Sequence, residues 1–157
     1  LQGSVMGEMQ HSAEALSPML LCVFQREELS ELYRRHPGLG FDITWIAARE
    51  EQMLDENLLS VGRRTALERA AYLIALLGGR ARSVGLNSGD RLILPITQQH
   101  IADTLGLSLV HTNKTIRKLI DRRLVRWREG GCEIVDIEGL TQLARWEGLG
   151  ERLRPLV

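Results

Sequence analysis

The side chains of this chain that could do chemistry are cations, amides and hydroxyls gathered between residues 97 and 128. Residues 108–128 hold seven Lys and Arg against one acid, Asp121. The zero net charge of the whole chain hides this cluster: four basic and ten acidic residues in 1–62 give −6, while sixteen and ten in 63–157 give +6. A dense local cluster of cations is typical of a nucleic-acid-binding surface, and the alternative is a solvated helix end.

Two helices joined by a tight turn are predicted to position these residues. Thr97 suits a helix N-cap, and Gly106 can take the left-handed conformation that ends a helix. Ser108 can then cap a second helix, predicted from Leu109 to about Arg123. This order of signals is a helix-turn-helix signature.

The second helix is predicted to have two faces with different roles. The buried stripe, at helical spacing, consists of Thr112, Ile116, Leu119 and Ile120, with Thr115 beside it. The opposite face carries Leu109, Val110, Asn113, Lys114 and Arg117. Such a face suits the DNA major groove, where aliphatic side chains touch thymine methyls, Asn pairs with adenine and Lys reaches guanine. Beside it, where phosphates run, lie Lys118, Arg122 and Arg123. We expect Arg117 and Lys118 to contact phosphate.

A β-hairpin is predicted after the second helix, with strands at residues 124–128 and 132–137 joined across 129–131. Its first strand alternates Arg126 and Arg128 with apolar residues, so the two cations share one face. We call this hairpin the wing and expect its cationic face to contact phosphate.

A long helical pattern without internal Pro or Gly runs from about Leu39 or Phe41 to Val61. One seam, at near-heptad spacing, comprises Ile43, Ile46, Ala47, Glu50, Met53, Leu54, Asn57 and Val61. We expect this seam to pair with a second copy of the chain, its polar members fixing the register. The alternative is a helix buried on two sides within one domain.

The predicted elements before the long helix are two short strands at residues 11–17 and 19–25 and a helix at 26–36, ended by Pro37. The chain opens at Leu1 with no initiator Met, so we expect a preceding part.

After the long helix, an interruption is predicted at Gly62, with a hinge at Val61 and Gly62. A further helix is expected to stop at Gly78 and Gly79. A short strand at residues 91–96 should then lead into the helix-turn-helix, and a closing helix at 138–146 should follow the wing.

The segment TQQHIADTLGLSLVHTNKTIRKLIDRRLV resembles the DNA-binding motif of the Crp/Fnr regulators, and its LGLSLVHTNKTIRKL core resembles the version found in α-proteobacterial members. Upstream, FDITWIAAREEQMLDENLLSVGRRTALERAAYLIALL resembles the dimerisation helix and the helix after it. The resemblance implies a mainly α fold with a small β component. Residues 1–62 would hold the end of a jelly-roll sensor barrel and the dimerisation helix, and residues 63–157 a winged helix-turn-helix domain.

The resemblance also implies a sequence-specific transcription regulator that binds an inverted-repeat operator as a homodimer. Its partners would be double-stranded DNA, a second copy of the chain and RNA polymerase, with no membrane. Base reading would come from positions Leu109, Val110 and Lys114. Phosphate contact would come from Thr97, Gln98, Gln99, Ser108 and His111, the last with a neutral surface histidine as its alternative.

Three positions depart from the pattern of the cyclic-AMP-binding members of that family. Those members hold the nucleotide phosphate with an Arg-Ser pair where this chain has His11-Ser12, and histidine poorly replaces a bidentate guanidinium. The cyclic-AMP receptor of that family carries an Arg and a Glu in place of Leu109 and Val110. These departures argue against cyclic AMP as the effector, which stays unknown, and predict a different operator. No cofactor is expected in this chain.

No arrangement in the sequence predicts catalysis or a metal site. His100 and His111 have no acid placed to orient them, and no Ser or Cys stands beside a predicted base. The only thiols, Cys22 and Cys132, suggest neither a disulfide framework nor a metal cluster, and a reducing cytoplasm is expected. The remaining alternative to a DNA-binding regulator is a winged-helix protein-interaction module, whose recognition face should be neutral or acidic.

Overall fold

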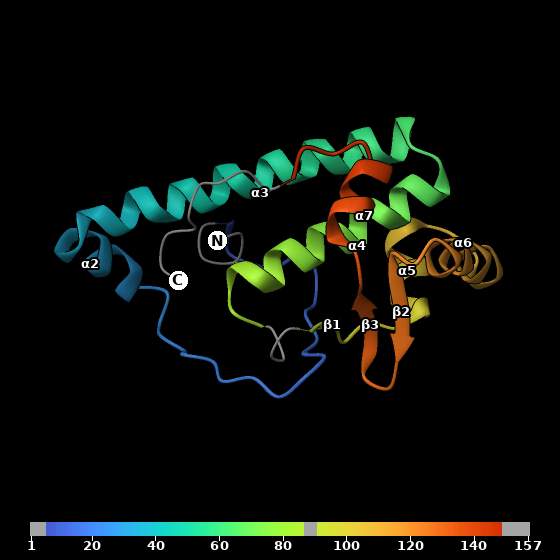
Figure 1. The fold of residues 1–157 in the computed structure, drawn as a ribbon. Helices are drawn as coiled ribbons and strands as arrows, with labels where there is room; N and C mark the ends of the chain where they lie inside the picture. The colour runs from blue at the N-terminus through green and yellow to red at the C-terminus, as the bar shows by residue number, and fades with distance from the viewer. Residues whose placement is uncertain (1–5, 87–90, 149–157) are drawn as a thin grey trace. The chain divides into compact units, whose positions relative to one another are not determined.

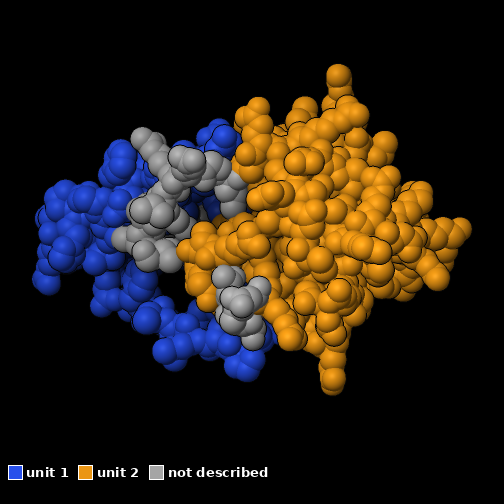
Figure 2. Space-filling model, in the orientation of Figure 1, with its two compact units in different colours: residues 1–54, 154–157 blue, residues 55–153 orange. Residues whose placement is uncertain are grey.

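The computed structural model describes residues 6–86 and 91–148 of the chain. The chain divides into two compact units, residues 1–54 with 154–157 and residues 55–153 (Figure 2). The division falls within the long helix α3 (Pro37–Arg63).

Residues 6–25 of the first unit form no strand, so the two strands predicted at 11–17 and 19–25 are wrong. Every residue of this segment is exposed, including the apolar run from Met19 to Phe24. A strand must bond its backbone to a neighbour, and two strands by themselves are not stable in water. Without a neighbouring strand, residues 6–25 do not pair into a sheet.

The short helix α2 (Glu28–Arg35) confirms the helix predicted over residues 26–36. Its acidic residues stand in the first turn and its basic residues in the last, as the helix dipole favours. Glu31 accepts a hydrogen bond from Arg35 at 2.7 Å, but both side chains are exposed, so the pair adds little stability.

Helix α3 is longer than predicted at both ends. It begins at Pro37, a residue well suited to the first helical position, and ends at Arg63. Gly62, the predicted interruption, therefore lies inside the last turn. Only Ser60 of this helix is buried. No helix in the described part of the chain, α3 included, has the length and apolar character to cross a membrane.

Helix α4 (Ala66–Ser83) is the centre of the second unit. It starts with a capping box, in which Thr65 accepts from the backbone N–H of Glu68 and the Glu68 carboxylate accepts from the backbone N–H of Thr65 at 2.8 Å. This hydrogen bond lowers the pKa of Glu68. All residues from 70 to 76 are buried, and the helix contacts α5, α6, α7 and β1. A helix buried round its whole circumference is a core helix.

The predicted end of this helix at Gly78 and Gly79 is wrong, because α4 continues to Ser83. A Cβ built on Gly78 would lie 2.3 Å from Ile134 Cδ1 and 3.4 Å from Leu92 Cδ2. Glycine thus allows the helix to approach the sheet closely, at a cost in helix propensity of about 1 kcal/mol. Gly78 is therefore required for close packing of the helix on the sheet and does not form a left-handed turn.

Three short strands, β1 (Leu92–Leu94), β2 (Val125–Arg128) and β3 (Gly131–Ile134), form an antiparallel sheet in the order β1-β3-β2. The predicted wing is confirmed, and Figure 1 shows β2 and β3 as a projecting hairpin. Cys132 lies on the buried face of the sheet, and its burial raises the pKa of the thiol to about 12. Helix α7 (Ile137–Leu143) closes the unit. It begins one residue before the predicted start at 138 and ends three residues before the predicted end at 146.

The wing turn offers a test of this packing, because Gly130 and Gly131 both have positive φ (95° and 134°) but different surroundings. A Cβ on Gly131 would lie 2.0 Å from the backbone oxygen of Leu94, whereas one on Gly130 would meet nothing within 4 Å. Gly130→Ala should cost ~1–3 kcal/mol for backbone strain. Gly131→Ala should cost a further ~1–3 kcal/mol for the clash. Equal losses in urea unfolding would contradict the close β1–β3 approach.

Candidate nucleic-acid interface

Helix α5 (Gln98–Leu105) is the first helix of the predicted helix-turn-helix, and its N-cap is Thr97 as expected. The Thr97 hydroxyl accepts from the backbone N–H of His100 at 3.1 Å, and His100 Nδ1 accepts from the backbone N–H of Thr97 at 3.2 Å. The histidine therefore takes the place that Glu or Gln usually holds in a capping box. Two of the free N–H groups at the start of α5 are satisfied in this way.

The turn after α5 is fixed by Gly106, whose φ of 62° and ψ of 38° are left-handed, as predicted. The backbone N–H of Leu107 then bonds to the carbonyl of Ala102 at 2.9 Å. A second support was not predicted: the half-buried Arg69 of α4 donates to the carbonyl of Leu105. An arginine in the first turns of a helix carries no sequence signal for this role, because the carbonyl it reaches is distant in the chain.

Helix α6 (Leu109–Asp121) is the second helix, and Ser108 caps it by accepting from the backbone N–H of His111 at 3.3 Å. The buried stripe is confirmed for Thr112, Thr115, Ile116 and Leu119. Ile120 was wrongly included, since it is 36% exposed and lies at the edge of the stripe. The helix also ends two residues before the predicted Arg123.

The predicted reading face of α6 is open to solvent. Leu109 is 43% exposed and Val110 is 66% exposed. The exposed polar members of this face are Asn113, Lys114 and Arg117, and the exposed cations beside it are Lys118, Arg122 and Arg123. Because the opposite stripe anchors α6 in the core, these side chains are held on a rigid element and not on a loop. Two aliphatic residues and several donors can contact base edges and phosphates there.

The predicted phosphate-contacting residues lie around the starts of α5 and α6. Thr97, Gln99, Ser108 and His111 are exposed, and Gln98 is half-buried. Gln99 donates to the Asp103 carboxylate at 2.7 Å. Helix N-termini attract anions through their backbone N–H groups and the positive end of the helix dipole. The arrangement is chemically suited to phosphate, and the roles of the individual residues stay predictions.

The wing arginines have a partner that the sequence did not reveal. Arg128 Nε lies 2.7 Å from Glu133 Oε2, and Arg126 Nη1 lies 3.4 Å from the same oxygen. The hydrogen bond from Arg128 lowers the pKa of Glu133, and the charges of Arg128, Arg126 and Arg91 add to the effect. The register of a hairpin, which sequence alone leaves open, decides this pairing.

The predicted dimer seam lies along α3. Its half-buried members are Ile43, Ile46, Glu50 and Met53, and its exposed members are Ala47, Leu54, Asn57 and Val61. No residue of this seam is buried, although most of its members are apolar. A mostly apolar seam that is only partly covered is suited to a partner.

Within residues 55–153, one buried arginine joins the end of α3 to the rest of the unit. Arg64 Nη2 lies 2.7 Å from Glu56 Oε1, and Arg64 Nε donates to the carbonyl of Ala144 at 2.7 Å. The guanidinium carbon also stands 4.8 Å from the ring centre of Tyr72, which packs edge-on against Trp146. This contact set fixes the start of α4 against the end of α7.

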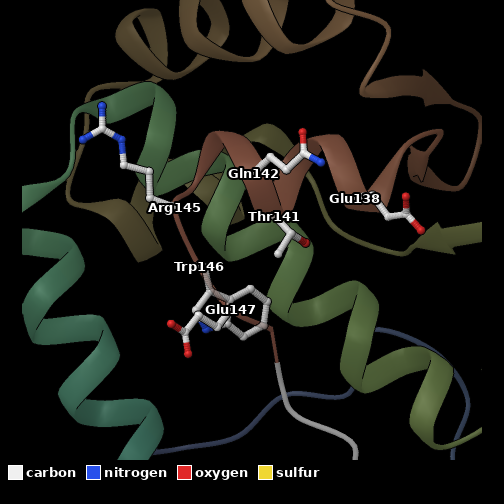
Figure 3. Close-up of a pocket in the computed structure, with 6 residues that line it drawn as sticks. All are labelled: Glu138, Thr141, Gln142, Arg145, Trp146 and Glu147. Carbon is white, nitrogen blue, oxygen red and sulfur yellow. The ribbon is translucent and has the colours of Figure 1, made fainter.

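A separate hollow of about 440 Å³ lies along α7 and is lined by Glu138, Thr141, Gln142, Arg145, Trp146 and Glu147 (Figure 3). The hollow is wide open, and none of these side chains is a nucleophile with a base beside it. Among the described residues, no three His, Cys, Asp or Glu side chains gather as a metal site.

Comparisons with known proteins agree with this geometry. Residues 68–143 match the Crp-like helix-turn-helix domain. The chain is 30% identical over 139 residues to the nitrogen fixation regulation protein FixK of Bradyrhizobium diazoefficiens, covering 88% of this chain and 58% of FixK. It is 32% identical over 133 residues to FixK of Rhizobium meliloti, covering 83% and 57%. The chain thus spans little more than half the length of these relatives.

A solved structure agrees with the fold. The structure of FixK2 from Bradyrhizobium japonicum superposes with a TM-score of 0.60 at 20% sequence identity, covering 80% of this chain and 60% of that one. At this identity the likeness bears on the fold alone. This fold, the matched Crp-like helix-turn-helix domain and the curated relatives together support assignment of the chain to the Crp/Fnr family.

Proposed function

We propose that this chain is a sequence-specific DNA-binding transcription regulator that binds an inverted-repeat operator as a homodimer. The observation that carries the proposal is the reading face of α6, where Leu109, Val110 and Lys114 are exposed while the opposite stripe is anchored in the core. Aliphatic contact favours thymine methyls, and a lysine favours guanine. The operator half-site should therefore hold thymines opposite Leu109 and Val110 and a guanine opposite Lys114.

A two-fold dimer would present two copies of α6 to successive major grooves. Its half-sites should be inverted repeats whose centres lie about one helical turn apart. Selection of bound sites from a random DNA pool, at stated salt concentration, tests this directly. A pool that converges on no inverted repeat would overturn the proposal. In the same proposal RNA polymerase is a further partner, and the effector is not cyclic AMP, since His11 and Ser12 stand where an Arg-Ser pair is needed.

The second candidate function is a winged-helix protein-interaction module, which the exposed Leu109 and Val110 favour. The cations Lys114, Arg117 and Lys118 on and beside the same helix face argue against it. The two functions differ in their response to salt. A phosphate-dominated complex weakens steeply as salt rises, whereas an apolar protein interface does not.

Lys114 should read a base. Lys114→Ala should cost ~1–3 kcal/mol of binding on the selected site and less on a site that lacks the guanine. Lys118→Ala, four residues along the helix and off the reading face, is the matched control and should weaken both sites equally. Equal losses for Lys114→Ala on the two sites would instead assign it to phosphate.

The wing should contact phosphate without reading sequence. Changing Arg126 and Arg128 together to Ala should weaken binding to all duplexes by similar factors and make the slope of log K against log salt shallower by ~1–2 units. Fluorescence anisotropy titrations over a range of salt concentrations measure this slope. An unchanged slope would remove the wing from the interface.

The seam of α3 should form the dimer. Burying Ile46 and Met53 against a second copy should contribute ~1.5–3 kcal/mol per side chain, so Ile46→Asp with Met53→Asp should give monomers in light scattering. Thr44→Asp with Gln52→Asp adds the same charge to the same helix away from the seam and should stay dimeric. A dimer that survives the seam variant, or a control that dissociates equally, would show that the interface lies elsewhere.

A further inference from the structure

The outer face of the β-sheet carries an acid among arginines. In the strand register, Glu133 of the central strand β3 stands opposite Arg126 of β2, while Arg128 stands opposite Gly131. Because Gly131 has no side chain, the Arg128 side chain can reach across to its diagonal neighbour Glu133. Cross-strand partners and diagonal neighbours on one face are within reach of long side chains. Both arginines accordingly meet the same carboxylate oxygen, at 2.7 Å from Arg128 and 3.4 Å from Arg126.

The three side chains differ in their access to solvent. The Glu133 side chain is only 10% exposed, whereas those of Arg126 and Arg128 are 54% and 44% exposed. The carboxylate is therefore covered, and the guanidinium groups form the outer surface. Arg128 bonds to Glu133 through Nε, which leaves its two terminal nitrogens for another acceptor.

The charge of this group is less than its arginines suggest. Because the pKa of Glu133 is lowered, its carboxylate is ionised at neutral pH. Two positive charges and one negative charge leave these three side chains with a net charge of +1. A carboxylate held between two cations also fixes their position, since without it the like charges would repel.

We propose that Glu133 sets the strength with which the wing binds phosphate, by positioning Arg126 and Arg128 and cancelling one of their two charges. The proposal rests on the DNA-binding function proposed above. As a consequence, Glu133 would limit the affinity of the chain for DNA of any sequence. Phosphate contacts supply this sequence-independent binding, and it competes with operator binding at every other site on a genome.

Glu133→Gln in the full chain tests the proposal, because the variant keeps the shape and an oxygen acceptor but loses the charge. Binding to a mixed-sequence duplex, measured by anisotropy across a range of salt concentrations, should become tighter at low salt. The slope of log K against log salt should steepen by ~0.9, the value for one further phosphate charge. Glu133→Asp retains the charge and should keep the slope of the unsubstituted chain.

Glu129→Gln is the charge-matched control, since Glu129 is exposed in the same hairpin, and its effect on the slope should be less than half as large. If thermal unfolding shows Glu133→Gln to be poorly folded, Glu133→Met should give the same steepening. An unchanged or shallower slope, or an equal effect of Glu129→Gln, would overturn the role of Glu133 while leaving DNA binding intact. If binding of the unsubstituted chain does not weaken with salt, both proposals are overturned.

Discussion

The second unit depends on one constraint, which is that helix α4 is buried on every side. Residues 70–76 are all buried, and three of them are alanines, whose small side chains let neighbouring helices approach. Gly78 extends this close approach to the sheet. Helices α5, α6 and α7 and strand β1 all contact α4, so each takes its position from the same core element. The buried face of α6 is close-packed in this core, and this packing fixes the direction in which its exposed face points.

Some arginines of this unit stabilise the fold and are not free to bind a ligand. Arg64, just before α4, donates to the carbonyl of Ala144 at the end of α7. Arg69, within α4, donates to the carbonyl of Leu105 at the end of α5. The last carbonyls of a helix lack partners within the helix, so a cation there satisfies a polar group and suits the helix dipole. A count of basic residues therefore overstates the charge that is free for a nucleic acid. Glu133 lowers that charge further in the wing.

The features that the sequence predicted correctly are those set by residues close together in the chain. Thr97, Gly106 and Ser108 act within one turn of their own positions, and these caps were confirmed. Gly78 was misread because a helix stop and a close helix–sheet contact require the same residue type, and only the tertiary fold distinguishes them. The strands expected at residues 11–25 failed for the same reason, since a strand is defined by its neighbour. The pairing of Glu133 with two arginines depends on hairpin register, which periodicity leaves undetermined.

Burial of Cys132 in the sheet also makes the two thiols of the chain very different in reactivity. Cys22 is exposed, whereas Cys132 is fully covered and its thiol stays protonated at neutral pH because its pKa is raised to about 12. Alkylating reagents attack the thiolate, so Cys22 is labelled directly and Cys132 only when the β-sheet opens. The labelling rate of Cys132 thus reports the free energy of that opening, and any ligand that holds the unit closed slows it.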